Sequence, residues 1–223
     1  MGMTLSAKIQ DDLRLNMVNG QLRTGGIVDP DVLAAFLATP REEFVAPAFA
    51  SLAYLDRDLP ALGAKARRLL PPMTLARMMQ AAGVTAGERA LDVGGGSGYG
   101  ASLLQHMGAK VVALESDPGA AEAARTALSG RADVTVVVGP LDGGAPHLGP
   151  FNVILIEGAF QTPPDALIAQ LADGGRLVGV DATAGISQAA LYEKVEGAVS
   201  RRALFETRAQ TVDGFQPRAS FAF

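Results

Sequence analysis

Cysteine is absent from this sequence of 223 residues, and histidine occurs only twice. Without cysteine, the chain has no disulfide bridges, thiolate metal sites or cysteine nucleophile. The two histidines, His106 and His147, are too far apart in the chain to form a local metal-binding motif. A zinc enzyme is therefore not expected, and we predict no metal site.

Charged residues are also scarce, at 19% of the chain, and the formal net charge at pH 7 is -4. This balance argues against binding of nucleic acids or anionic membranes through bulk charge. No apolar run approaches the ~18 residues of a membrane-spanning helix, and the N-terminus has no apolar signal-peptide core. We therefore expect a soluble cytoplasmic protein without a nucleic-acid or membrane partner.

Apolar residues are abundant, at 48% of the chain, which is enough for a sizeable core. The length suits one structural unit. Because the pattern of the chain changes near Pro72, we divide this unit into residues 1–72 and residues 73–223. The first part predicts a helical cap, and the second predicts an α/β domain.

The cap predicts two helices and an irregular segment. Apolar side chains recur at helical spacing over residues 6–18, which indicates an amphipathic helix. A second helix is predicted over residues 29–39, where Pro30 suits the first turn. Residues 56–72 are rich in turn formers, and we expect them to be irregular.

Helices and strands alternate in the second part. Helices are predicted over residues 73–83, 98–108, 118–130 and 164–175, and strands over residues 88–95, 109–116, 133–139, 151–159 and 176–182. Residues 186–198 mix strand and helix signals, and the tail from about 198 to 223 predicts two strands around Val212-Asp213-Gly214. The alternation predicts an α/β fold with a doubly wound, mostly parallel, Rossmann-like sheet beneath an N-terminal helical cap.

The most informative motif is the glycine-rich segment from Asp92 to Gly100, which follows a predicted strand and opens a predicted helix. Its alternate glycines allow a tight turn and a close approach of the backbone to a ligand. A dinucleotide fingerprint would need glycine where the chain has Tyr99, so a nicotinamide dehydrogenase is a distant alternative. The spacing acid-x-G-x-G-x-G is instead typical of S-adenosylmethionine (SAM) methyltransferases. It places Asp92 near the positively charged methionine end of SAM.

A second acid supports the same cofactor. Glu115 ends the next predicted strand, about 20 residues after the loop, where an acid can bind both ribose hydroxyls; the alternative is a solvated strand end. Tyr99 would pack against the cofactor or against the first helix. We expect SAM to be the cofactor, with contacts from Asp92, Gly94, Gly96, Ser97, Gly98, Tyr99, Glu115 and Ser116.

Motifs on both sides of the glycine loop carry a more specific resemblance. They include Gln21-Leu22, Gly26-Ile27, Asp29-Pro30, Pro40-Arg41-Glu42, Phe44-Val45, Ala53-Tyr54, Pro150-Phe151-Asn152-Val153-Ile154 and Gly174-Gly175-Arg176-Leu177-Val178. With the glycine loop, they resemble the protein-L-isoaspartate O-methyltransferase family over roughly residues 15–182. A generic methyltransferase would not share the cap motifs.

This resemblance implies a repair reaction. The methyl group of SAM would be transferred to the free carboxylate of L-isoaspartyl residues in damaged proteins or peptides. The ester then collapses to a succinimide, which can reopen as a normal aspartyl residue. A carboxylate with a pKa of ~4 is already a nucleophile at pH 7, so no general base is required. In-line positioning and desolvation would then be the enzyme's contribution.

The chain departs from the family's pattern at three places. The family's substrate-binding serine falls on Leu70, although Arg67 and Arg68 could pair with a carboxylate instead of forming a solvated loop. The acid of the family's adenine loop is displaced to Asp142, which reaches the adenine amino group if the loop bulges and otherwise belongs to a plain turn. Glu157 follows a strand, where it could contact the acceptor or the ammonium group of SAM; the alternative is a solvated strand end. We count the last two acids among the cofactor contacts, and no catalytic residue is certain.

These departures leave three hypotheses open. The leading one is a SAM-dependent isoaspartyl methyltransferase, with activity that is weak or absent because leucine has no donor or acceptor. The second is a methyltransferase of the same fold with another acceptor, including a small molecule. The third is a SAM-binding or regulatory protein in which the altered loop closes the acceptor site. The sequence does not indicate the oligomeric state.

Overall fold

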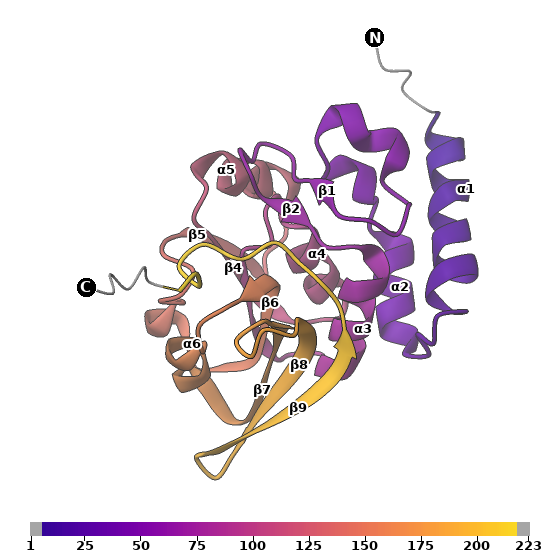
Figure 1. Cartoon of the computed structure of the whole chain (residues 1–223). Helices are drawn as coiled ribbons and strands as arrows, with labels where there is room; N and C mark the ends of the chain where they lie inside the picture. Colours follow the sequence, from indigo (N-terminus) through magenta and orange to yellow (C-terminus); the bar gives the residue numbers. More distant parts are fainter. Residues whose placement is uncertain (1–5, 218–223) are drawn as a thin grey trace.

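The computed structural model describes residues 6–217 as a central sheet with helices packed on it (Figure 1). Seven strands form the sheet in the order β5-β4-β3-β6-β7-β8-β9. Neighbours from β5 to β7 pair in parallel, whereas β8 and β9 are antiparallel. The strands are β3 (Arg89–Val93), β4 (Lys110–Glu115), β5 (Val134–Val138), β6 (Phe151–Phe160), β7 (Leu171–Asp181), β8 (Gln188–Val195) and β9 (Ala198–Glu206). The predicted α/β fold with a mostly parallel sheet is confirmed.

The helices begin where the sequence supplies capping groups. At the start of α2, the carboxylate of Asp29 accepts hydrogen bonds from the N–H groups of Asp31 and Val32, and Pro30 occupies the first turn. A π-helical turn, Val18–Leu22, continues α1. The helices are α1 (Ala7–Met17), α2 (Pro30–Ala38), α3 (Pro72–Ala82), α4 (Tyr99–His106), α5 (Pro118–Ala127) and α6 (Asp165–Ala169).

Both faces of the sheet are buried, as is typical of parallel strands. Ala90 of β3 belongs to a core that includes α3, α4 and the N-terminal helices. Its neighbours Leu91 and Val93 belong to a core on the other face, together with Leu167 of α6 and Val212. The central strands therefore lie between two apolar layers, and the carboxyl ends of the parallel strands meet at one edge.

The N-terminal segment packs onto the first of these cores. Met17, Leu22 and Phe36 are at most 1% exposed. The ring of Phe36 contacts the ring of Tyr99 edge to face, with 6.0 Å between centroids. The segment predicted to be irregular contains a short antiparallel hairpin, β1 (Leu59–Pro60) and β2 (Arg68–Leu69). This hairpin brings the arginines at 67 and 68 to the carboxyl edge of the sheet.

One sequence-based prediction of secondary structure is wrong, and a second is tested only as far as residue 217. The helix predicted over residues 164–175 ends as α6 at Ala169, and β7 starts at Leu171. Between its pairings with Phe151 and Val153, β7 bulges, and this bulge absorbs the Gly174-Gly175 pair. Between residues 198 and 217, the tail contains one strand, β9; beyond it, Thr211 makes an isolated bridge to Ala159. The predicted tail also extends into residues 218–223, which lie outside the described part.

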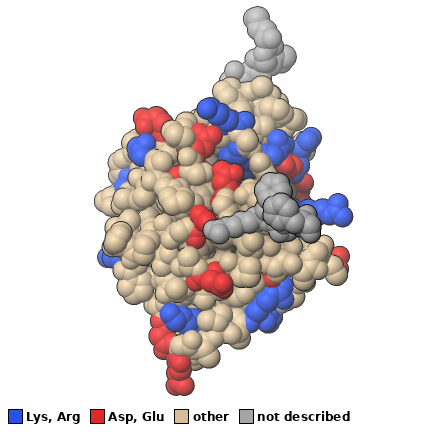
Figure 2. All heavy atoms as spheres, turned by 60° about the vertical axis from the view of Figure 1, so that its left-hand side comes forward, with Lys and Arg blue, Asp and Glu red and all other residues tan. Residues whose placement is uncertain are grey.

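The surface carries both signs of charge. In the view of Figure 2, lysine and arginine side chains are interspersed with aspartate and glutamate, and no extended region has a single sign. Within residues 6–217, no helix combines the length and the apolar character needed to cross a bilayer.

Candidate cofactor and acceptor site

The glycine loop forms the turn between β3 and α4. Gly94, Gly96 and Gly98 have φ angles of 71°, 66° and 91°, a region that side chains with a Cβ rarely adopt. Ser97 donates its hydroxyl hydrogen to the carbonyl of Phe44, which ties the loop to the N-terminal segment. The loop is therefore a fixed turn at the carboxyl edge of the sheet, where doubly wound folds bind ligands.

Glu115 faces this loop from the end of the adjacent strand. Its carboxylate accepts hydrogen bonds from the N–H groups of Gly96 at 2.9 Å, Ser116 at 2.7 Å and Asp117 at 3.2 Å. The side chain is 2% exposed, so it is not a solvated strand end. The parallel pairing of β3 with β4 brings the two predicted cofactor motifs together.

Arg67 lies across the same loop. Its Nε is 3.5 Å from Oε2 of Glu115, and its Nη2 is 3.2 Å from Oδ2 of Asp213. A Cβ placed on Gly96 would lie 3.1 Å from the Cγ of Arg67. Arg67 is therefore a buried cation of the cofactor edge, a position that the sequence did not predict because the pairing spans most of the chain.

The segment after β9, residues 207–217, returns over this edge, and we call it the strap. Val212 is fully buried, and a Cβ on Gly94 would lie 3.4 Å from its Cγ1. The hydroxyl of Ser116 donates to Asp213 at 2.9 Å. A Cβ on Gly214 would lie 2.7 Å from the carboxylate of Asp142. Asp142 therefore faces the strap, and its role toward adenine stays a prediction.

Tyr99 points away from the loop and into the N-terminal core. It is fully buried, and its ring packs against Phe36 and Phe44. The guanidinium carbon of Arg41 lies 5.0 Å from the centroid of this ring. Arg41 is itself fully buried and donates from Nη2 to the carbonyl of Leu70 at 3.0 Å. A buried arginine thus connects the N-terminal segment to the residue that replaces the family's serine.

Asp92 and Glu157 meet beneath the glycine loop. Their strands, β3 and β6, are parallel neighbours, and the two side chains are 1% and 2% exposed. Both approach the position where Gly95 would carry a Cβ, and Glu157 Oε1 would overlap a Cβ on Gly100. No hydrogen-bond donor of the described residues reaches any of the four carboxyl oxygens. One proton shared between the two carboxyl groups would supply the missing hydrogen bond.

The environment of this pair disfavours two negative charges. Burial raises the pKa of Asp92 well above its usual range, and the charge of Glu157 adds to the effect. Burial also raises the pKa of Glu157 to about 7, although the nearby charge of Arg41 opposes the rise. Glu157 is therefore not a solvated strand end, and it titrates near neutral pH.

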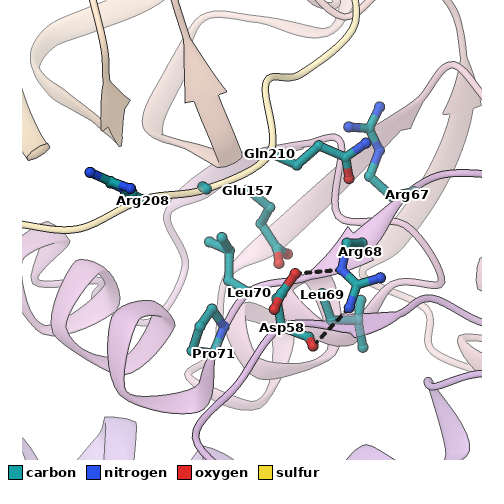
Figure 3. A pocket seen from close by; sticks show the side chains of 10 residues that line it. Asp58, Arg67, Arg68, Leu69, Leu70, Pro71, Glu157, Arg208 and Gln210 are labelled. Atoms are coloured by element: carbon teal, nitrogen blue, oxygen red, sulfur yellow. Dashed lines mark hydrogen bonds and ion pairs between the residues drawn. The ribbon is translucent and has the colours of Figure 1, made fainter. Parts of the chain in front are cut away.

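A cavity of about 250 Å³ opens beside the pair (Figure 3). Its walls include Arg67, Arg68, Leu70 and Arg208, and Glu157 points into it. Arg68 forms an ion pair with Asp58 at the rim. The structure thus assembles the residues of the altered substrate loop around one cavity, next to the glycine loop.

The residues at this edge fit SAM chemically. Arg67 and Val212 pack on Gly96 and Gly94 of the turn, and Glu115 presents an anion at the strand end next to it. Asp92 borders Gly95 of the loop, where the positive charge of an ammonium group would favour its ionised form. Among residues 6–217, no group of three or more histidine, aspartate and glutamate side chains is arranged to hold a metal ion.

Sequence comparisons identify similar proteins. The family profile described as protein-L-isoaspartate(D-aspartate) O-methyltransferase matches residues 14–211. The protein-L-isoaspartate O-methyltransferase of Methylorubrum populi is 41% identical over 169 residues, which cover 75% of this chain and 79% of the relative. The protein-L-isoaspartate O-methyltransferase of Aeropyrum pernix is 37% identical over 198 residues, which cover 86% of this chain and 75% of the relative.

Solved structures show the same fold. A protein-L-isoaspartate O-methyltransferase aligns with a TM-score of 0.79 and 26% identity, covering 92% of this chain and 66% of that one. A Plasmodium falciparum protein described as a putative protein-L-isoaspartate O-methyltransferase, in complex with S-adenosyl-L-homocysteine, aligns with a TM-score of 0.76. The two sequences are 19% identical, and the alignment covers 92% of this chain and 98% of that one. At this level of identity, the similarity shows a shared fold only.

Proposed function

The chain belongs to the protein-L-isoaspartate(D-aspartate) O-methyltransferase family, and from this premise we propose that it methylates the free carboxylate of L-isoaspartyl residues in damaged proteins or peptides. SAM is the methyl donor of this SAM-dependent family. The observation that carries the proposal is the cavity that joins the altered substrate loop to the glycine loop, with Arg67 bordering both. The cytoplasmic location expected from the sequence stays a prediction.

The proposed roles follow from charge and position. When bound, SAM supplies an electrophilic methyl group on a sulfonium centre. Glu115 would hold the ribose hydroxyls, and Asp92 would face the ammonium group. Arg68 at the cavity wall would attract the acceptor carboxylate, and the apolar side chain of Leu70 would exclude water from it. No residue needs to remove a proton, because the acceptor is already ionised at neutral pH.

Leu70 makes a second candidate necessary. It is 3% exposed, and its side chain offers neither a donor nor an acceptor to an isoaspartyl carboxylate. A leucine at position 70 is equally compatible with a methyltransferase of this family that has a different acceptor, or with a SAM-binding protein without catalysis. We therefore expect isoaspartyl methylation to be selective but weak.

A paired assay tests the proposal. Methyl transfer from SAM is measured to an isoaspartyl peptide and to its normal aspartyl twin, beside SAM binding by calorimetry. Weak transfer to the isoaspartyl peptide alone supports the proposal. Equal transfer to both peptides, or no transfer while SAM is bound, would overturn it and favour the second candidate.

A further inference from the structure

Glu157 is the buried acid of the cavity, and its two carboxyl oxygens have no hydrogen-bond partner in the described part of the chain. A buried polar group without a partner is costly, so such a group in a cavity indicates an interaction that a ligand completes. Figure 3 shows the Glu157 side chain directed toward the centre of the cavity, with Leu70 on one side and Arg68 on the other. Its two carboxyl oxygens are buried against Asp92 and the glycine loop, so an acceptor in the cavity reaches them only after the side chain turns toward it.

The charges around Glu157 come from several elements. Behind it lie Asp92 on β3 and Glu115 on β4; beside it lie the cations from the N-terminal segment and the hairpin. The cavity rim adds charges of both signs. The facing groups are Asp92, Glu115, Arg41, Arg67 and Tyr99, and the rim groups are Asp58, Arg68 and Arg208.

Charge balance requires the Asp92–Glu157 pair to hold at least one proton. Two ionised carboxylates in contact would carry two negative charges beside the fully buried guanidinium of Arg41, which compensates one of them. With one shared proton, Asp92 and Glu157 together carry a single negative charge that balances Arg41. An acceptor carboxylate that enters the cavity adds a second negative charge next to Glu157.

We propose, on the basis of the proposed function, that Glu157 takes up a proton from solvent when an acceptor carboxylate enters the cavity and donates a hydrogen bond to it. Glu157 thereby positions the acceptor and selects an anionic one. Only the bonds of the proton change in this step: its bond in a hydronium ion or buffer acid breaks, an O–H bond forms at Glu157, and the Asp92–Glu157 pair becomes neutral. The arginines of the cavity wall compensate the charge of the acceptor.

Proton uptake at this site is feasible near neutral pH. Burial raises the pKa of Glu157 to about 7, and the entry of a second anion raises it further. Below this pH, Glu157 presents a donor to the acceptor, whereas above it the ionised group repels the acceptor. The acceptor affinity should therefore fall about tenfold between pH 6 and pH 8, as expected for one linked proton.

The experiment is titration calorimetry of the intact protein with an isoaspartyl peptide, and with succinate as a small dicarboxylate, at pH 6 and pH 8. Repeating each titration in two buffers of different ionisation enthalpy gives the number of protons taken up. We expect uptake at pH 8, with a dissociation constant about tenfold higher than at pH 6. Glu157→Gln keeps an N–H donor but cannot titrate. It should abolish the uptake and give a pH-independent affinity close to the wild-type value at pH 6.

Two further variants test whether Glu157 itself, and not another carboxylate of the protein, binds the acceptor and takes up the proton. Glu157→Ala removes the donor and should weaken binding at both pH values. Glu122→Gln changes an exposed carboxylate on α5, outside the cavity, and should keep both the uptake and the pH dependence. Binding with proton uptake but without methyl transfer refutes the proposed function and leaves this inference standing. Binding without uptake by the wild-type protein, or failure of both ligands to bind at pH 6, overturns the inference.

Discussion

Arg67 and Glu115 form a buried ion pair over the glycine loop, with 3.5 Å between Nε and Oε2. The strap reinforces this pair through Asp213, which also accepts from Ser116. The carboxylate proposed to hold the ribose of SAM is therefore held by the chain's own guanidinium. We therefore expect the cofactor to compete with Arg67 for Glu115.

Replacement of Arg67 should consequently strengthen SAM binding. In Arg67→Ala, Glu115 keeps its three backbone N–H partners, and the cofactor no longer competes with the ion pair. We expect the dissociation constant to fall roughly tenfold, about 1.4 kcal/mol, in calorimetry. Arg68→Ala, which breaks only the rim pair with Asp58, should leave it unchanged. Unchanged or weaker binding by Arg67→Ala would show that the ion pair does not oppose the cofactor.

Glu115 itself should be required for the cofactor. Glu115→Ala removes charged hydrogen bonds to the ribose hydroxyls and should weaken SAM binding by roughly 1–3 kcal/mol. The matched control is Glu122→Ala, which truncates an exposed glutamate on α5. Equal affinities of the two variants for SAM would show that Glu115 does not bind the cofactor.

Leu70 should limit isoaspartyl methylation. Leu70→Ser supplies a hydroxyl to the acceptor, and a charge-assisted hydrogen bond of ~2–3 kcal/mol corresponds to a gain in kcat/KM of roughly 30- to 150-fold. Leu70→Ala also shortens the side chain but adds no donor, so it should show no such gain. The measurement is kcat/KM with an isoaspartyl peptide. A similar gain in both variants would mean that the smaller side chain, and not the hydroxyl, increases the rate.

The stability of the folded chain should depend on Glu157 near neutral pH. Its pKa rises from 4.5 to about 7 on folding, so the folded state binds more protons than the unfolded state in this range. The free energy of unfolding should therefore fall as pH rises from 4.5 to 7. Urea unfolding across this range should give a shallower dependence for Glu157→Gln, whereas Glu122→Gln on the surface should keep the wild-type slope. An unchanged slope in Glu157→Gln would contradict the assignment.

Gly100 should be coupled to Glu157. A Cβ at this helical position would overlap Oε1 of the glutamate, so Gly100→Ala should destabilise the protein by about 1–3 kcal/mol. Shortening the partner removes the overlap, so the same substitution in a Glu157→Ala background should cost much less. A double-mutant cycle from urea unfolding measures this coupling. Additive costs would mean that the helix shifts to accommodate the methyl group.

The sequence predicts what depends on local spacing. The alternation of apolar strands and helices gives the parallel sheet, and the glycine spacing places the turn after β3. The contacts of Arg67 with Glu115 and Asp213 depend on pairing between distant segments, so no local pattern indicates them. The bulge in β7 was not predicted for the same reason. The pairing of Leu171 with Phe151 starts the strand before the bulge, and this pairing joins distant segments.

The contact between Gly100 and Glu157 also restricts the order in which a lineage can acquire these residues. A glutamate that arises at position 157 while position 100 carries a side chain would be buried against it. Acquiring the glycine first avoids this clash, and once the glutamate is present, replacement of the glycine alone costs stability. The buried acid thus raises the cost of regaining a side chain at position 100, and prior loss of the glutamate lowers that cost.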